Sequence, residues 1–138
     1  GAMIKAGIPA LTLELGESHV INEKNVRDGI AAVWQILCSL GMVMQDPLLE
    51  VSFKPPKEFV EKPLTYYDEP KSQTSGLVRY SKKPGDVIKT GEPVARVYNV
   101  FGKLQETALA KKGGVILGHS DTAVSFPGSP LAAFGVLK

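Results

Sequence analysis

The sequence has little of what several classes of protein require. It contains one cysteine in 138 residues and therefore no internal disulfide framework. No apolar run approaches the roughly 20 residues that span a bilayer, and no charged-then-apolar segment at the start indicates a signal peptide. These absences favour a reducing, cytoplasmic setting with no membrane anchor.

Excess charge of one sign is also missing. Sixteen Lys and Arg stand against 14 Asp and Glu, which gives a formal net charge of +2. This balance excludes a strongly basic nucleic-acid surface. Aromatic residues make up 7% of the chain and do not alternate with the lysines as a base-stacking platform requires. We therefore expect a globular protein that does not bind nucleic acid.

The first residues indicate a piece of a longer protein. Residues 1–3, Gly-Ala-Met, are typical of a tag remnant and are left out of the fold prediction. Residues 8–15 form an apolar run that is typical of a strand buried in an α/β sheet. Without neighbouring strands this run would pair within the chain, pair with another copy, or stay poorly ordered, and so the order of residues 4–20 stays open.

A helix is predicted over residues 22–41. Six apolar side chains recur there at helical period and form one face, which we expect to pack in a core. They are Val26, Ile30, Val33, Trp34, Leu37 and Leu40. Asn22 or Asn25 can cap the first turn, and Gly41 suits the left-handed residue that closes many helices. With the preceding strand, this helix makes a strand-helix unit over residues 4–45.

Residues 46–74 are predicted to be a connection, because repeated prolines remove backbone donors and break helices. The prolines are Pro47, Pro55, Pro56, Pro63 and Pro70. Lysine and acidic residues are interspersed among them.

Residues 75–138 contain an internal near-repeat. Residues 87–97 align with residues 124–134 in one pattern: an apolar residue, three spacers, Gly-x-Pro, then apolar-Ala-x-apolar. Upstream, Gly-Leu-Val at 76–78 matches Gly-Val-Ile at 114–116 at nearly the same distance. Each copy indicates a strand, a turn, a short strand, a glycine turn and a strand. Two such copies predict a β sandwich or flattened barrel with pseudo-twofold symmetry.

This repeat resembles the lipoyl/biotinyl domain, in which Gly-Asp-x-Val-x-x-Gly turns recur. Residues 84–91 here read Pro-Gly-Asp-Val-Ile-Lys-Thr-Gly. The wider order of motifs includes Thr-Leu-Glu-Leu-Gly at 12–16, the helix, the proline-rich stretch, Asn-Val-Phe-Gly at 99–102 and Glu-Thr at 106–107. That order resembles the C-terminal portion of the succinylglutamate desuccinylase/aspartoacylase family, over residues 7–136.

The resemblance implies an α+β fragment: the end of a zinc-carboxypeptidase-like α/β domain, followed by a lipoyl-like β domain that lines the substrate entrance and supports homo-oligomer contacts. Family members deacylate an N-acyl amino acid or a related small molecule. They hold zinc through a His-x-x-Glu pair and a later His, and a glutamate in a Thr-x-Glu-x-Gly frame activates the zinc-bound water. That glutamate corresponds to Glu14. The His-x-x-Glu pair has no counterpart here, so we expect zinc ligands upstream in the parent protein and an inactive fragment.

Glu14 also stands out without the resemblance. A carboxylate at the C-terminal end of a buried strand lies where α/β folds place active sites. As general base and then general acid it would take a proton from water and deliver it to the leaving amine. The alternative is an ordinary surface glutamate at a strand end.

Three further residues have both a functional and a plain interpretation. For His19 we favour a loop residue over a contact at the rim of the substrate pocket, because a lone histidine is weak support for a metal ligand. His119 is predicted in a solvated turn, again with rim contact as the alternative. The two histidines are 100 positions apart in the sequence.

Lys103 lies between the two repeats, where carrier domains of this fold bear biotin or lipoate. The Asp-Lys-Ala and Met-Lys-Met contexts of such domains are absent, and Phe101 and Leu104 are expected to be buried flanks. We therefore favour an ordinary hairpin lysine. A non-catalytic adaptor built on the same β unit is the other alternative to the deacylase.

Overall fold

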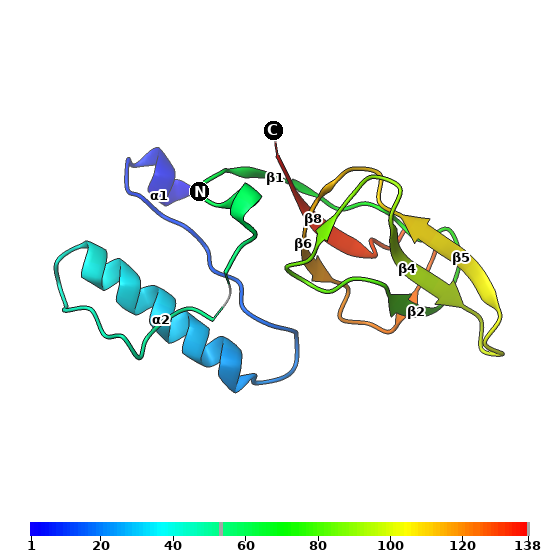
Figure 1. Ribbon diagram of the computed structural model, residues 1–138, viewed down its shortest axis with the longest axis horizontal. Coiled ribbons are helices and arrows are strands. Elements are labelled where there is room, and N and C mark those ends of the chain that lie inside the picture. The colour runs from blue at the N-terminus through cyan, green and yellow to red at the C-terminus, as the bar shows by residue number, and fades with distance from the viewer. Residues whose placement is uncertain (53, 138) are drawn as a thin grey trace. The chain divides into compact units, whose positions relative to one another are not determined.

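The computed structural model describes residues 1–52 and 54–137, and they form two units, Gly1–Lys54 and Pro55–Lys138 (Figure 1). The first unit is drawn in blue to green-cyan and contains the helices; the second, in green to red, contains the strands. The boundary divides the connection expected over residues 46–74 between the two units.

The first unit has two helices, α1 (Ala2–Lys5) and α2 (Glu23–Ser39). The prediction of the long helix is confirmed. Asn22 has an extended backbone, and its side chain accepts a hydrogen bond from the Lys24 N–H, which satisfies one free donor of the first turn. After α2, Gly41 takes a left-handed φ of 71°. No helix within the described residues is long and apolar enough to cross a bilayer.

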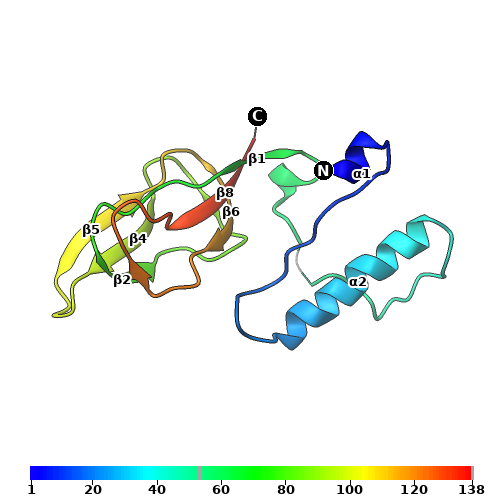
Figure 2. The same cartoon turned by 180° about the vertical axis from the view of Figure 1, so that it is seen from behind.

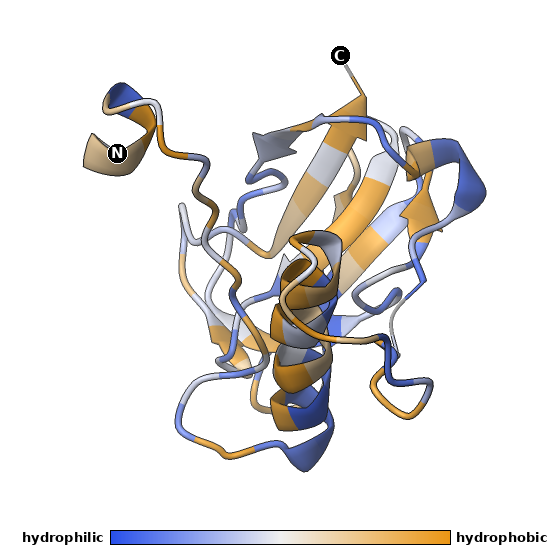
Figure 3. Cartoon of the chain, turned by 90° about the vertical axis from the view of Figure 1, so that its left-hand side faces the viewer, coloured by the Kyte–Doolittle hydropathy of each residue, from blue (hydrophilic) through white to orange (hydrophobic). Residues whose placement is uncertain are grey.

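The predicted burial of the apolar face of α2 is wrong for this chain. The helix buries only Ala31 and Asp28, while Val33 is 55% exposed and Leu40 is 67% exposed. Figure 3 shows the hydrophobic bands along this helix. The apolar period was correctly read, but among the described residues of the first unit there is no sheet for that face to cover.

The strand expected over residues 8–15 is also absent. The backbone is irregular there, and every side chain from residue 1 to residue 20 is exposed. A strand is stable only when its backbone groups pair with a neighbour. The described part of the first unit contains no other strand, so the run has nothing to pair with.

The second unit consists of two four-stranded antiparallel sheets, seen from behind in Figure 2. The first sheet has the order β1-β8-β6-β3, and the second has the order β5-β4-β2-β7. Their bounds are β1 (Leu64–Tyr67), β2 (Gly76–Tyr80), β3 (Val87–Ile88), β4 (Pro93–Tyr98), β5 (Leu104–Leu109), β6 (Gly114–His119), β7 (Val124–Ser125) and β8 (Ala132–Leu137). A short 3₁₀ turn, η1 (Lys57–Phe59), precedes them.

Strand β1 lies inside the segment that we expected to be a connection, so this expectation is corrected. Leu64–Tyr67 pairs with β8 at the edge of the first sheet. Pro63 precedes the strand and Pro70 follows it, so no proline removes a donor from the ladder itself. The prolines bound this strand and do not exclude it.

The core of the second unit lies between the two sheets and contains residues from both. It consists of Ile88, Val94, Ala95, Ala108, Ala110, Ile116, Leu131, Ala132 and Phe134. Phe134, in β8, is the largest fully buried side chain, at 1% exposure. Burial alternates along β2, as the period of a strand requires, whereas β4, β6 and β8 each bury at least two consecutive residues.

Two glycine turns in the second unit share one hydrogen-bond pattern. Gly91 and Gly128 have φ angles of 84° and 86°, which a side chain disfavours. The Gly91 N–H donates to the carbonyl of Ala110, and the N–H of Ala110 donates to the carbonyl of Glu92. At the other turn, the Gly128 N–H donates to Ser72, and the Ser72 N–H donates to Ser129. Each turn therefore bonds to a residue on the C-terminal side of an edge strand: Ala110 directly after β5, and Ser72 in the loop after β1.

Candidate functional site

Glu14 lies on the exposed irregular segment of the first unit. Gly16 turns this segment with a φ of 80°, and a Cβ at Gly16 would collide with the Asn25 amide. A Cβ at Gly29 would lie 2.8 Å from the Leu15 Cδ1. At both points the segment that carries Glu14 passes close to α2. A side chain at Gly16, the glycine of the Thr-x-Glu-x-Gly frame, would therefore clash with Asn25 of α2.

Glu17 and His19 follow on the same exposed segment. The Asn25 Nδ2 donates to the Glu17 Oε2 at 3.3 Å, which adds a second link to α2. His19 occupies a turn with a left-handed φ of 66° and is exposed. Its two interpretations, a loop residue or a contact at a pocket rim, stay predictions.

His119 does not lie in a solvated turn, because it ends strand β6 and is half-buried. Its ring stacks on Tyr80 of β2, with 3.9 Å between ring centroids and 5° between ring planes. Its Nε2 is buried and has no hydrogen-bond partner within the described chain. Burial lowers the pKa of His119, while the Asp86 carboxylate opposes this shift. Burial therefore favours the neutral imidazole, and burial likewise raises the pKa of Tyr80.

A cavity of about 450 Å³ lies beside His119 in the second unit. Its walls combine the apolar Phe126 and Ala132 with the hydroxyls of Ser120 and Thr122. This volume falls in the range of small-ligand pockets. The sequence suggested His119 for a rim but gave no signal for Tyr80, whose stacking depends on pairing between distant strands.

Lys103 lies in the hairpin between β4 and β5 and is exposed. Its N–H donates to the Asn99 Oδ1 at 3.0 Å, and its carbonyl accepts from the Asn99 N–H at 2.9 Å. The expectation of buried flanks is wrong, since Phe101 is 91% exposed and Leu104 is 47% exposed. Phe101 lies at the tip of the hairpin, and Leu104 begins the edge strand β5.

Side chains that could bind a metal ion are dispersed over the described part of the chain. Within residues 1–52 and 54–137, no group of three His, Cys, Asp or Glu is arranged to hold a metal ion. The residues present therefore do not fit zinc. Glu14 and His19 belong to the first unit, and His119 and Lys103 to the second; the structure brings neither pair into direct contact.

Glu106, which the sequence analysis noted only as part of the Glu-Thr motif at 106–107, is the centre of a group of hydrogen bonds. Its Oε2 accepts hydrogen bonds from the Ser72 hydroxyl at 3.1 Å and from the Gln73 N–H at 2.9 Å. The Thr74 N–H and hydroxyl donate to the same oxygen at 3.2 and 3.1 Å. This carboxylate joins the loop before β2 to strand β5. Its partners lie 32 to 34 positions away, so no local pattern could have indicated them.

Three solved structures contain this fold over part of their length. A succinylglutamate desuccinylase from Silicibacter sp. TM1040 aligns with 99% of this chain at a TM-score of 0.68 and 19% identity. The ectoine utilization protein EutE (DoeB) from Ruegeria pomeroyi aligns with 98% at 0.71 and 18% identity. A succinylglutamate desuccinylase/aspartoacylase from Rhodobacter sphaeroides aligns with 99% at 0.70 and 17% identity.

The match covers only part of those proteins. This chain spans 40%, 41% and 43% of their respective lengths. No protein-family model matches the chain, and no curated protein matches it. The resemblance expected from the sequence is thus confirmed at the level of the fold: the chain has the architecture of the C-terminal part of succinylglutamate desuccinylase/aspartoacylase structures.

Proposed function

We propose that this chain is the C-terminal portion of a zinc-dependent hydrolase that deacylates an N-acyl amino acid or a related small molecule. The observation that carries this proposal is the alignment of 99% of the chain with two fifths of a succinylglutamate desuccinylase. The Thr-x-Glu-x-Gly frame at residues 12–16 supports it independently. A cytoplasmic location and a homo-oligomeric parent are part of the same proposal.

Glu14 is the proposed general base and acid of the parent enzyme. Its exposure supports this role, because a catalytic carboxylate must reach a substrate. The zinc ligands are proposed to lie upstream, since the described residues offer no set of three. On this proposal the chain is inactive alone. His19 and His119 are the proposed contacts at the rim of the substrate pocket.

We further propose that the second unit is a lipoyl-like sandwich made of two structural repeats. The two sheets have corresponding strand orders, since β1, β8, β6 and β3 of the first sheet occupy the same positions as β5, β4, β2 and β7 of the second. The matching hydrogen bonds at Gly91 and Gly128 support the same relation.

The test is hydrolysis by the zinc-loaded parent enzyme of a panel of N-acyl amino acids, including N-succinylglutamate and N-acyl aspartates. The Glu14→Gln variant is expected to lose several orders of magnitude in kcat, while its zinc content and unfolding midpoint stay unchanged. Glu17→Gln, three residues along the same exposed segment, is the matched control and is expected to stay active. Equal activity of the parent and the Glu14→Gln variant would refute the role of Glu14.

The two alternatives predict different results. If no panel member is hydrolysed, the fold supports a non-catalytic adaptor instead. A biotin or lipoate carrier would show the added group on Lys103 in an intact mass spectrum. The exposed hairpin position of Lys103 is the observation that keeps this alternative open.

A further inference from the structure

The outer face of the second sheet carries two ordered rows of side chains. Strand register places Leu77 of β2 opposite Tyr98 of β4 on one side and Val124 of β7 on the other. Tyr98 in turn lies opposite Leu104 of β5. Leu77, Leu104 and Val124 are all exposed. Together with Tyr98 they form a line across all four strands, which we call the apolar row.

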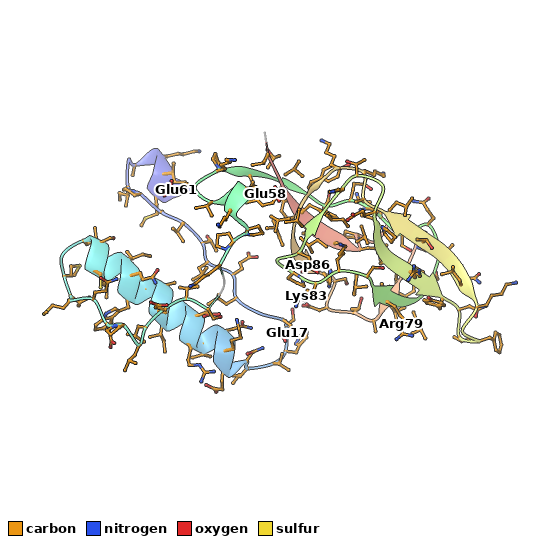
Figure 4. All side chains as sticks on the ribbon, in the orientation of Figure 1. Glu17, Glu58, Glu61, Arg79, Lys83 and Asp86 are labelled. Atoms are coloured by element: carbon orange, nitrogen blue, oxygen red, sulfur yellow. The ribbon has the colours of Figure 1, made fainter. Side chains whose placement is uncertain are left out.

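The second row is basic. Two positions along β2 and β4 from the apolar row, Arg79 lies directly opposite Arg96. Thr107 of β5, beyond a register shift in that strand, completes the row. Both arginines are exposed, and Figure 4 labels Arg79 at β2. Neither forms an ion pair with a carboxylate among the described residues. Like charges directly opposite on neighbouring strands destabilise a sheet, so the fold gains nothing from this pair.

The β4–β5 hairpin extends the same face with an exposed apolar tip. Val100 is 82% exposed and Phe101 is 91% exposed. The Asn99 Oδ1 accepts from the N–H groups of Phe101 and Lys103, both at 3.0 Å. Gly102 closes the turn with a φ of 77°. The tip is thus preorganised, so holding it in a complex costs little conformational entropy.

A groove joins these features. It has a volume of about 530 Å³ and is lined by Leu77 and Tyr98 of the apolar row, by Val100 of the tip, and by Arg79. Arginine and aromatic residues are enriched in protein interfaces, while Lys, Glu and Asp are depleted. The two rows contain two arginines and a tyrosine and none of the three depleted types.

We propose that this face is a docking surface for a polypeptide segment that presents a carboxylate next to an apolar side chain. The carboxylate binds between Arg79 and Arg96, where paired guanidinium groups offer charge-assisted hydrogen bonds. The apolar side chain covers Leu77 and Tyr98. The two rows lie two residues apart, about 7 Å along a strand, so an extended segment matches them with residues i and i+2.

The positive charge of the face disfavours a second copy of this chain as the occupant. In a twofold dimer, a surface patch meets its own copy. With the symmetry axis through the basic pair, Arg79 and Arg96 would face two more arginines with no carboxylate between them. The partner is therefore a different polypeptide surface, one that supplies the negative charge.

The experiment is an NMR titration of the ¹⁵N-labelled 138-residue chain with the blocked peptide acetyl-Ser-Leu-Ser-Glu-Ser-amide. Saturable shifts are expected at the amides of Leu77, Arg79, Arg96 and Tyr98. The same peptide with Lys in place of Glu is expected to produce none. The double variant Arg79→Gln, Arg96→Gln is expected to bind the first peptide about tenfold or more weakly.

The controls separate the proposal from its competitors. The double variant Lys83→Gln, Lys89→Gln loses the same charge elsewhere in the second unit and is expected to bind normally. The proposal is overturned if the Lys peptide binds as well as the Glu peptide, or if no shift at these amides saturates. Equal shifts from hexanoate would replace the polypeptide by a small amphiphilic anion. Shifts that depend on protein concentration without peptide would identify a second copy as the occupant.

Discussion

Both units of this molecule contain patterned apolar residues, but the second unit buries them and the first leaves most of them exposed. The second unit buries a cluster of nine hydrophobic residues between its sheets. In the described part of the first unit only Asp28 and Ala31 are buried. There the chain is held by polar links: the Trp34 Nε1 donates to the Met44 carbonyl at 3.1 Å, and Asp28 accepts from Ser52. An apolar pattern therefore identifies a face, but burial depends on a surface that the face can cover.

The largest expected difference between the units concerns large-to-small substitutions. Phe134→Ala should lower the free energy of unfolding of the second unit by about 3–5 kcal/mol, because it leaves a cavity in a closed core. Val33→Ala on the exposed face of α2 should change stability by no more than about 0.5 kcal/mol. Urea unfolding measures both. Comparable losses would remove the contrast between the units.

A smaller loss is expected when the Glu106 carboxylate is removed. Glu106→Ala leaves the donors of Ser72, Gln73 and Thr74 without their acceptor and should cost about 1–3 kcal/mol. Thr107→Ala, the next residue of β5 and exposed, is the matched control and should cost no more than about 0.5 kcal/mol. If the two variants unfold at the same urea concentration, Glu106 does not hold the loop.

The pH dependence of the second unit should include a step from His119. Burial lowers its pKa below 6.5, so the unfolded chain takes up a proton at higher pH than the fold does. The stabilising contribution is full above pH 6.5 and is lost as the pH falls through the lower pKa of the folded state. An NMR titration of the imidazole should give a midpoint below 6.5. A midpoint at or above 6.5 would mean that Asp86, not burial, dominates.

In the first unit the corresponding step belongs to Asp28. Hydrogen bonds from the Ser52 hydroxyl and N–H, and then from Lys24, lower the pKa of Asp28 from 3.8 to about 2. The carboxylate therefore stabilises this unit above pH 3.8, and the contribution is lost as the pH falls through about 2. The Ser52 amide shift should titrate with that midpoint. Titration near 3.8 would show that the Asp28–Ser52 link is absent in solution.

The sequence predicts local structure well wherever local chemistry decides it. A cap at Asn22 or Asn25, the left-handed Gly41 after α2 and the glycine turns at Gly91 and Gly128 were all readable, because each depends on neighbours within a few residues. Strand β1 was missed because the surrounding prolines outweighed a run of four residues whose partner lies some 70 positions away. The strand expected at 8–15 failed for the converse reason, since pairing requires a second strand.

The candidate site was less predictable than the fold. Glu14 could be singled out because its frame is short and continuous. The Tyr80–His119 stack and the cross-strand pair Arg79–Arg96 are invisible in the sequence, because register between distant strands creates them. Buried and paired residues of this kind can be found only after the topology is known.

Amide hydrogen exchange on the dilute 138-residue chain tests the central contrast most directly. The amides of Ile116 and Leu131, which donate to the Asp86 and Pro70 carbonyls, should exchange slowly, at the rate of global unfolding of the second unit. The amides of Leu11 to Leu15 should exchange at nearly the rate of an unstructured peptide. Equal protection of both groups would show that residues 8–15 form a paired strand within the chain and would contradict this account.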